Sequence, residues 1–156
     1  MNRWGRIVWS LAALASAAWI SGGLLGYRIV DAETLARHTL VAFSALLALA
    51  LTHLWVAVYL VVLERLMRRG FATSAAATRA LTSARRRGVA AAAVAVFAPV
   101  AQFTSANALY PSRLDAGWHA VAGLLTAIAL GVALGLERRA LRDAGGAAAE
   151  GGDEAP

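Results

Sequence analysis

Long apolar stretches without a charged residue alternate along this chain with short segments rich in Arg. The uncharged stretches are residues 7–27, 38–63, 88–112 and 116–136. A helix needs about 20 apolar residues to cross the hydrocarbon core of a bilayer, so each stretch is long enough. None alternates polar and apolar residues as barrel strands do, and only helices or closed barrels satisfy the backbone in lipid. The sequence therefore predicts an all-α fold, an up-down bundle of four transmembrane helices within residues 1–142, with the third span at about 88–110.

The arginines fall unequally on the two sides of such a bundle. Twelve lie before the first span, between the second and third spans, or after the fourth, whereas Arg28, Arg37 and Arg113 lie on the other side. Cytoplasmic loops carry an excess of basic residues. We therefore expect both termini and the central loop, residues 64–87, to be cytoplasmic. The basic part of this loop, residues 74–87, is helix-permissive and would attract anionic inner-leaflet lipids, although a loop that only sets the topology is favoured.

The two ends of the chain have distinct patterns. Ala15-Ser16-Ala17 fits a cleavable signal peptide, but the apolar run continues to Val30, which favours a retained helix. Residues 143–156 consist of Ala, Gly and acids with one terminal Pro. Such a segment has little apolar area to bury, so it is predicted to be a disordered acidic tail.

Composition narrows the classes of function. Hydrophobic residues make up 60% of the 156 residues, too many for a soluble domain of this size. Cysteine is absent, which excludes disulfide scaffolds, thiol redox chemistry and Cys-ligated metal sites. The net charge of +6 comes from arginines placed between apolar blocks, not on one face of a soluble module, so it indicates topology and no nucleic acid. Every acid lies at a span boundary or outside a span, which argues against a proton-coupled transporter.

Glycines in the fourth span predict a close helix contact. Gly131 and Gly135 are four residues apart, and small residues at this spacing let helix backbones approach each other in a membrane. The contact would lie within the bundle, with a second copy in a homodimer, or with a membrane-protein partner. The contact within the bundle is favoured because four helices already have interfaces to fill.

Three histidines are the candidate functional residues. His53 lies near the middle of the second span, where an ionisable group is uncommon and usually faces the bundle interior. It is equally well explained as a neutral structural residue that is hydrogen-bonded to a Ser or Thr, such as Ser16 or Thr126. His38 and His119 lie on the outer side, where they would form the axial pair for one haem b. Polar residues also gather at a water interface without any ligand, which is the favoured interpretation of this pair.

The residues Thr52-His53-Leu54-Trp55-Val56 with Tyr59, together with His38 and Gly117-Trp118-His119, resemble a group of uncharacterised four-helix bacterial inner-membrane proteins. The resemblance covers most of residues 35–142, and the chain departs from it after Tyr59. It implies a bacterial plasma (inner) membrane location and a shared role for the three histidines, but no activity.

These observations favour a non-catalytic accessory protein or subunit of a membrane complex, for example a respiratory one. The alternative is a haem b-binding electron carrier that uses His38, His119 and His53. A small transporter or channel ranks third, because the sequence shows no acid inside a span.

Overall fold

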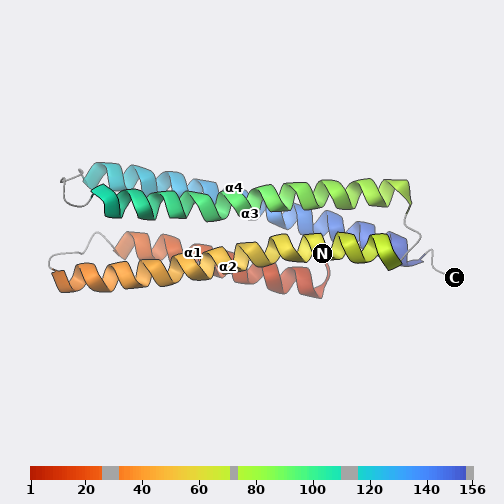
Figure 1. Ribbon diagram of the computed structural model, residues 1–156, viewed down its shortest axis with the longest axis horizontal. Coiled ribbons are helices and arrows are strands. Elements are labelled where there is room, and N and C mark those ends of the chain that lie inside the picture. The colour runs from red at the N-terminus through yellow and green to blue at the C-terminus, as the bar shows by residue number, and fades with distance from the viewer. Residues whose placement is uncertain (26–31, 71–73, 110–115, 154–156) are drawn as a thin grey trace.

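The computed structural model describes residues 1–25, 32–70, 74–109 and 116–153, and side-chain surroundings for 1–22, 33–69, 74–105 and 120–149. These residues form four helices and no strand. The helices are α1 (Arg3–Leu25), α2 (Ala32–Gly70), α3 (Ala75–Leu109) and α4 (Ala116–Asp153). Consecutive helices run antiparallel and pack against each other, and α1 also contacts α4 (Figure 1). The predicted all-α fold of four helices is confirmed.

Large apolar side chains point outward and small ones fill the interior. Leu14, Trp55 and Phe97, from three different helices, are each more than 60% exposed. Ala12, Ala84, Ala95 and Ala140 are, by contrast, completely buried. A soluble protein rarely exposes so much apolar surface, whereas lipid-embedded helices pack through small residues and turn large ones toward lipid.

Three of the helices in the described part of the chain, α2, α3 and α4, are long and apolar enough to cross a membrane. This indicates a membrane protein. The shorter α1 has 23 residues, and Arg3 and Arg6 lie in its first turns.

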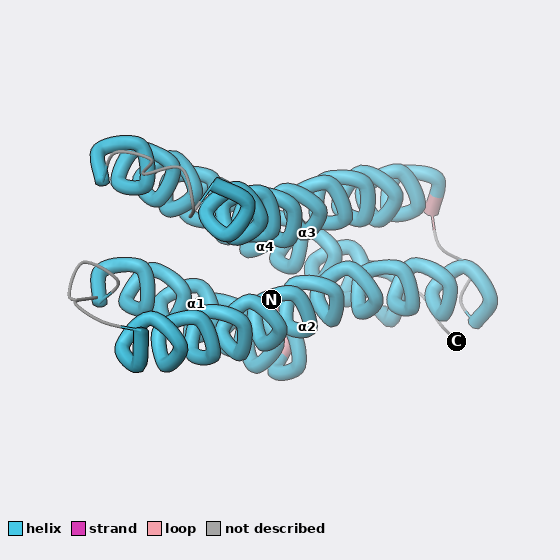
Figure 2. The backbone as a smooth tube through the Cα atoms, turned by 60° about the vertical axis from the view of Figure 1, so that its left-hand side comes forward, coloured by secondary structure: helices cyan, strands magenta, loops and turns pink. Residues whose placement is uncertain are grey.

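The helices differ in length, and this gives the bundle two unlike ends. α2 has 39 residues and is therefore about 58 Å long, nearly twice the hydrocarbon thickness of a bilayer. α1 begins well short of one end, so that α2, α3 and α4 alone form the end with the α2–α3 connection and the C-terminus (Figure 1). At the opposite end α1 lies beside α2, and α3 beside α4 (Figure 2).

The predicted disordered tail is wrong over most of its length, because α4 continues to Asp153. The physical reason is packing as well as the high helix propensity of Ala. Ala144 and Ala147 are buried in the same apolar cluster as Met67 and Ala77, so this end of α4 has a partner to pack against. Residues 154–156 lie outside the described residues.

The central loop is shorter than predicted. α2 runs on to Gly70 and α3 begins at Ala75, so the Arg-rich residues lie on two extended helices. Leu81 and Ala84 of α3 are buried against this end of the bundle, which explains why the helix continues past the apolar span. Residues 74–87 are helical, as their composition allowed, but they are continuous with the third span.

The favoured packing of Gly131 inside the bundle is also wrong. A Cβ added to Gly131 or to Gly135 would meet nothing within 4 Å, and Val132 beside them is 57% exposed. The glycine row therefore lies on the outer surface of α4. Gly88 of α3, in contrast, makes a tight helix contact, because it faces Leu60 and Ala140.

Candidate functional site

Ser16, His53 and Glu137 meet in the interior of the bundle, and we call these three residues the polar layer. His53 Nδ1 lies 2.8 Å from Glu137 Oε1, and His53 Nε2 lies 3.1 Å from Ser16 Oγ. All three side chains are buried, with exposures of 0% for His53 and Glu137 and 1% for Ser16. The polar layer thus joins α1, α2 and α4 through one imidazole ring.

The polar layer separates two apolar clusters of the core. On one side lie Ala15 and Trp19 of α1 with Leu49 and Leu130. On the other side lie Val8, Ala12, Val56, Leu60 and Ala140, in the cluster that extends into the three-helix end. Water is therefore kept away from the polar layer along the bundle axis in both directions.

Helical spacing places each member of the polar layer on a buried face. On α4 the buried positions recur every three or four residues, at Thr126, Leu130, Ala133, Glu137 and Ala140. Such a row stays on one side of a helix with 3.6 residues per turn. His53 lies between the buried residues Leu49 and Val56 in the same way.

The hydrogen bonds determine where protons lie in the polar layer. Ser16 Oγ lies 2.9 Å from the carbonyl oxygen of Ala12, and in the arrangement in which its single proton is donated there, it accepts a hydrogen bond from His53 Nε2. His53 Nε2 therefore carries a proton, and one further proton lies in the bond between Nδ1 and Glu137 Oε1. Whether that proton belongs to the imidazole or to the carboxyl group, the polar layer is electrically neutral.

A neutral polar layer is the form that a buried site favours. The alternative, in which Ser16 donates to His53 Nε2, would leave one uncompensated negative charge in the interior, at a cost of several kcal/mol. One acceptor remains open in either case. Glu137 Oε2 is buried and has no hydrogen-bond partner within the described part of the chain.

The structure does not bring the three candidate histidines together. Both ring nitrogens of His53 are engaged in the polar layer, so His53 does not fit an axial haem ligand in this arrangement. His38 lies fifteen residues earlier on α2, about 22 Å away along the helix, and is partly buried. The side chain of His119, near the start of α4, lies outside the described residues, so the His38–His119 pair stays a prediction. Where side chains are described, no group of three or more metal-ligating residues is found.

Sequence reasoning missed Glu137, the partner of His53. The charge-free spans placed every acid at a boundary or outside, but Glu137 is completely buried and bonded to the middle of α2. Ser16, in contrast, was one of the two predicted partners of His53, and its contact is confirmed; Thr126 is buried elsewhere on α4. The signal that could have identified Glu137 is its position seven residues after Leu130 and four residues after Ala133, in a row of buried-face spacing.

Comparisons with protein families, with curated proteins and with solved structures find no match for this chain. The resemblance carried by residues 52–59 therefore stays a prediction. Within that segment the structure buries His53 and Val56, and it leaves Leu54 and Trp55 more than half exposed. Tyr59 donates a hydrogen bond to Asn2 Oδ1 at 3.0 Å, which ties the N-terminus to α2.

Proposed function

We propose that this protein crosses a bacterial plasma membrane four times, with both termini and the α2–α3 connection in the cytoplasm. The proposal counts α1 as a fourth span, in addition to the three helices that are long and apolar enough to cross a membrane. It is supported by the exposed apolar side chains of α1, among them Leu11 and Leu14, and by the twelve arginines on one side against three on the other.

Reporter fusions test this topology. Fusions after Arg87 and after Arg142 are expected to report a cytoplasmic location, and a fusion near Ser112 an external one. An external location for the Arg87 fusion would reverse the orientation. Opposite locations for the N-terminus and the C-terminus would mean an odd number of spans. In that case α1 would not be a transmembrane helix.

Within this topology we propose that the protein is a non-catalytic subunit of a larger membrane complex, and that the polar layer is its functional site. The observation that carries the proposal is the bond between His53 Nδ1 and Glu137 Oε1. Ionisable groups inside a membrane are expensive and are typical of proton pathways and ion sites. A purely structural role is weaker, because well-packed apolar residues usually replace a buried ion pair without loss of stability.

The polar layer exchanges one proton with its surroundings in this proposal. In the resting form one proton is shared between His53 and Glu137, and the net charge is zero. Glu137 Oε2 is an open acceptor, so a second proton can bind there and give a carboxylic acid beside an imidazolium, with a net charge of +1. This charged form carries the cost of a buried charge, so it is the short-lived form and the neutral one is the resting form. Release of that proton restores the resting form without breaking the contact to Ser16.

Infrared difference spectroscopy of the protein in lipid nanodiscs tests the exchange. A shift in pH is expected to change the carbonyl band of a protonated carboxylic acid, and Glu137→Gln should remove that change. Glu33→Gln is the matched control, because Glu33 is an exposed acid paired with Arg37. A spectrum that is unchanged by Glu137→Gln across the pH range in which the protein stays folded would contradict proton exchange and leave a structural pair.

A further inference from the structure

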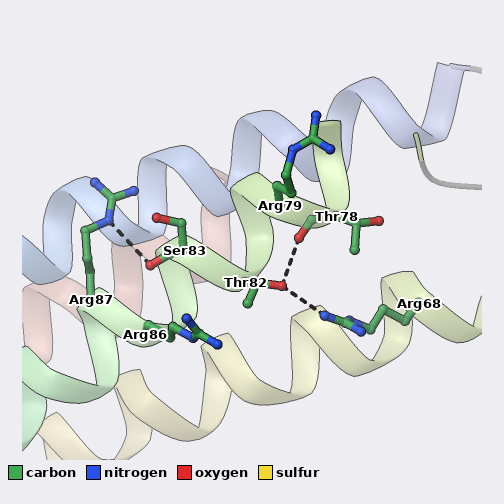
Figure 3. Close-up of a pocket in the computed structure, with 7 residues that line it drawn as sticks. All are labelled: Arg68, Thr78, Arg79, Thr82, Ser83, Arg86 and Arg87. Atoms are coloured by element: carbon green, nitrogen blue, oxygen red, sulfur yellow. Dashed lines mark hydrogen bonds between the residues drawn. The ribbon is translucent and has the colours of Figure 1, made fainter. Parts of the chain in front are cut away.

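A basic groove lies between α2 and α3 at the three-helix end of the molecule. Its volume is about 460 Å³. Arg68 lines it from α2, and three arginines and three hydroxyl side chains line it from α3. Figure 3 shows Arg68 and Arg86 extending into the space between the two helices.

Two of the arginines in the groove are available for a ligand. Arg68 is bonded to Glu64 and to Thr82, and Arg87 is paired with Asp143 at 2.6 Å. Arg79 and Arg86 make no ion pair or hydrogen bond with other side chains in the described residues. They are seven residues apart, two helical turns, and therefore lie on the same side of α3.

The groove keeps an excess of positive charge. Glu64 is buried and already accepts hydrogen bonds from Arg68 and Thr82, with Arg85 Nε 2.7 Å from its second oxygen. Its single charge is thus shared between two arginines. Figure 3 shows the Arg86 guanidinium extending toward α2 and the Arg79 guanidinium extending away from α2. The two groups, which have no ion pair in the described residues, therefore supply separate donors that match the oxygens of phosphate groups.

The groove lies at the edge of the apolar outer surface. Leu66 of α2 is 59% exposed and Val89 of α3 is 40% exposed, and each is two residues from an arginine of the groove. In a membrane this edge lies at the level of the lipid headgroups. We infer that the groove binds the phosphate oxygens of anionic lipid headgroups through Arg79 and Arg86. The inference rests on the proposed membrane insertion but not on the polar layer.

Spin-labelled lipids test this inference with the full-length protein in membranes. The fraction of immobilised lipid is measured for labelled phosphatidylglycerol and for labelled phosphatidylcholine. The wild type is expected to prefer phosphatidylglycerol severalfold, and Arg79→Gln/Arg86→Gln should lose most of that preference. Arg139→Gln/Arg142→Gln is the matched control, because it removes the same charge from exposed positions on α4 and should keep the preference.

Three outcomes would overturn the inference. Equal loss in both double variants would mean that only the overall charge attracts the lipid. No preference in the wild type would mean that the groove binds no lipid phosphate. The third outcome is that millimolar inorganic phosphate displaces the labelled phosphatidylglycerol and also raises the unfolding temperature of the protein in neutral detergent, where no anionic lipid is present. That result would identify a site for a soluble anion instead. All the substituted arginines are exposed, so unchanged circular dichroism is expected to confirm that each variant folds.

Discussion

Leu60 of α2 lies directly against the backbone of Gly88 in α3: its Cδ1 is 2.1 Å from the position that a Cβ on residue 88 would occupy. Ala140 of α4 approaches the same position to 3.3 Å. Leu60 is itself only 2% exposed, so any shift of its side chain takes place inside the core. Gly88 is therefore a point at which α2, α3 and α4 approach one another closely.

Gly88→Ala should destabilise the bundle by about 1–3 kcal/mol, because the added methyl group overpacks a filled site. The measurement is thermal unfolding in detergent. Adding Leu60→Ala should recover part of the loss, so the double variant should be more stable than the sum of the two single changes predicts. Purely additive effects would mean that Leu60 does not restrict residue 88.

Gly131→Leu should leave the stability of the isolated bundle unchanged, because the side chain would extend into open space. The same substitution should weaken self-association if Gly131 and Gly135 form a contact between two copies. The measurement is energy transfer between labelled copies in liposomes. Val132→Leu is the control, because Val132 is the neighbouring exposed residue on α4. Loss of thermal stability in the monomer would instead mean that Gly131 faces the interior of the bundle.

Glu137→Ala should destabilise the protein by about 3–5 kcal/mol, because it leaves His53 buried without its partner. His53→Leu/Glu137→Leu should be close to the wild type in stability or above it, since both polar groups are replaced together. The unfolding temperatures of the two variants and of the wild type give this comparison. A double variant as unstable as Glu137→Ala would show that the pair is needed for folding.

Ala147→Glu should detach the end of α4, because it puts a charge into the apolar cluster that holds Met67 and Ala77. Limited proteolysis should then cut residues 143–153 faster than in the wild type. Ala149→Glu is the matched control on the exposed side of the same helix turn and should not change the cleavage. Equal cleavage of both variants would mean that this end of α4 is not held by packing.

The sequence predicts the four helices because membrane crossing demands long uncharged stretches, and such stretches are easy to recognise. It does not predict where α2 and α4 end or where α3 begins, because the segments beyond the spans are good helix formers whose buried faces contain alanine. Alanine carries little hydropathy signal, although Ala84 and Ala140 are completely buried.

Two of the three residues of the polar layer can be recognised in the sequence. His53 and Ser16 lie inside spans, so their burial and contact could be predicted. Glu137 follows the last uncharged residue of the fourth span and precedes Arg138, so it looks like a boundary residue. Which side of a helix faces its neighbours depends on tertiary packing, and only the arrangement of α2 against α4 shows that Glu137 points inward.

The sequence separation of 84 between His53 and Glu137 has a consequence for biosynthesis. The ribosome makes α4 after α1, α2 and α3, so the imidazole of α2 stays without its carboxyl partner until α4 has been made. Moving a carboxylate from the aqueous boundary of the membrane into the bundle costs free energy, and the contact with His53 offsets that cost. Closure of the bundle thus waits for α4, and a nascent chain arrested before residue 116 contains an unsatisfied histidine that distinguishes it from the closed four-helix bundle.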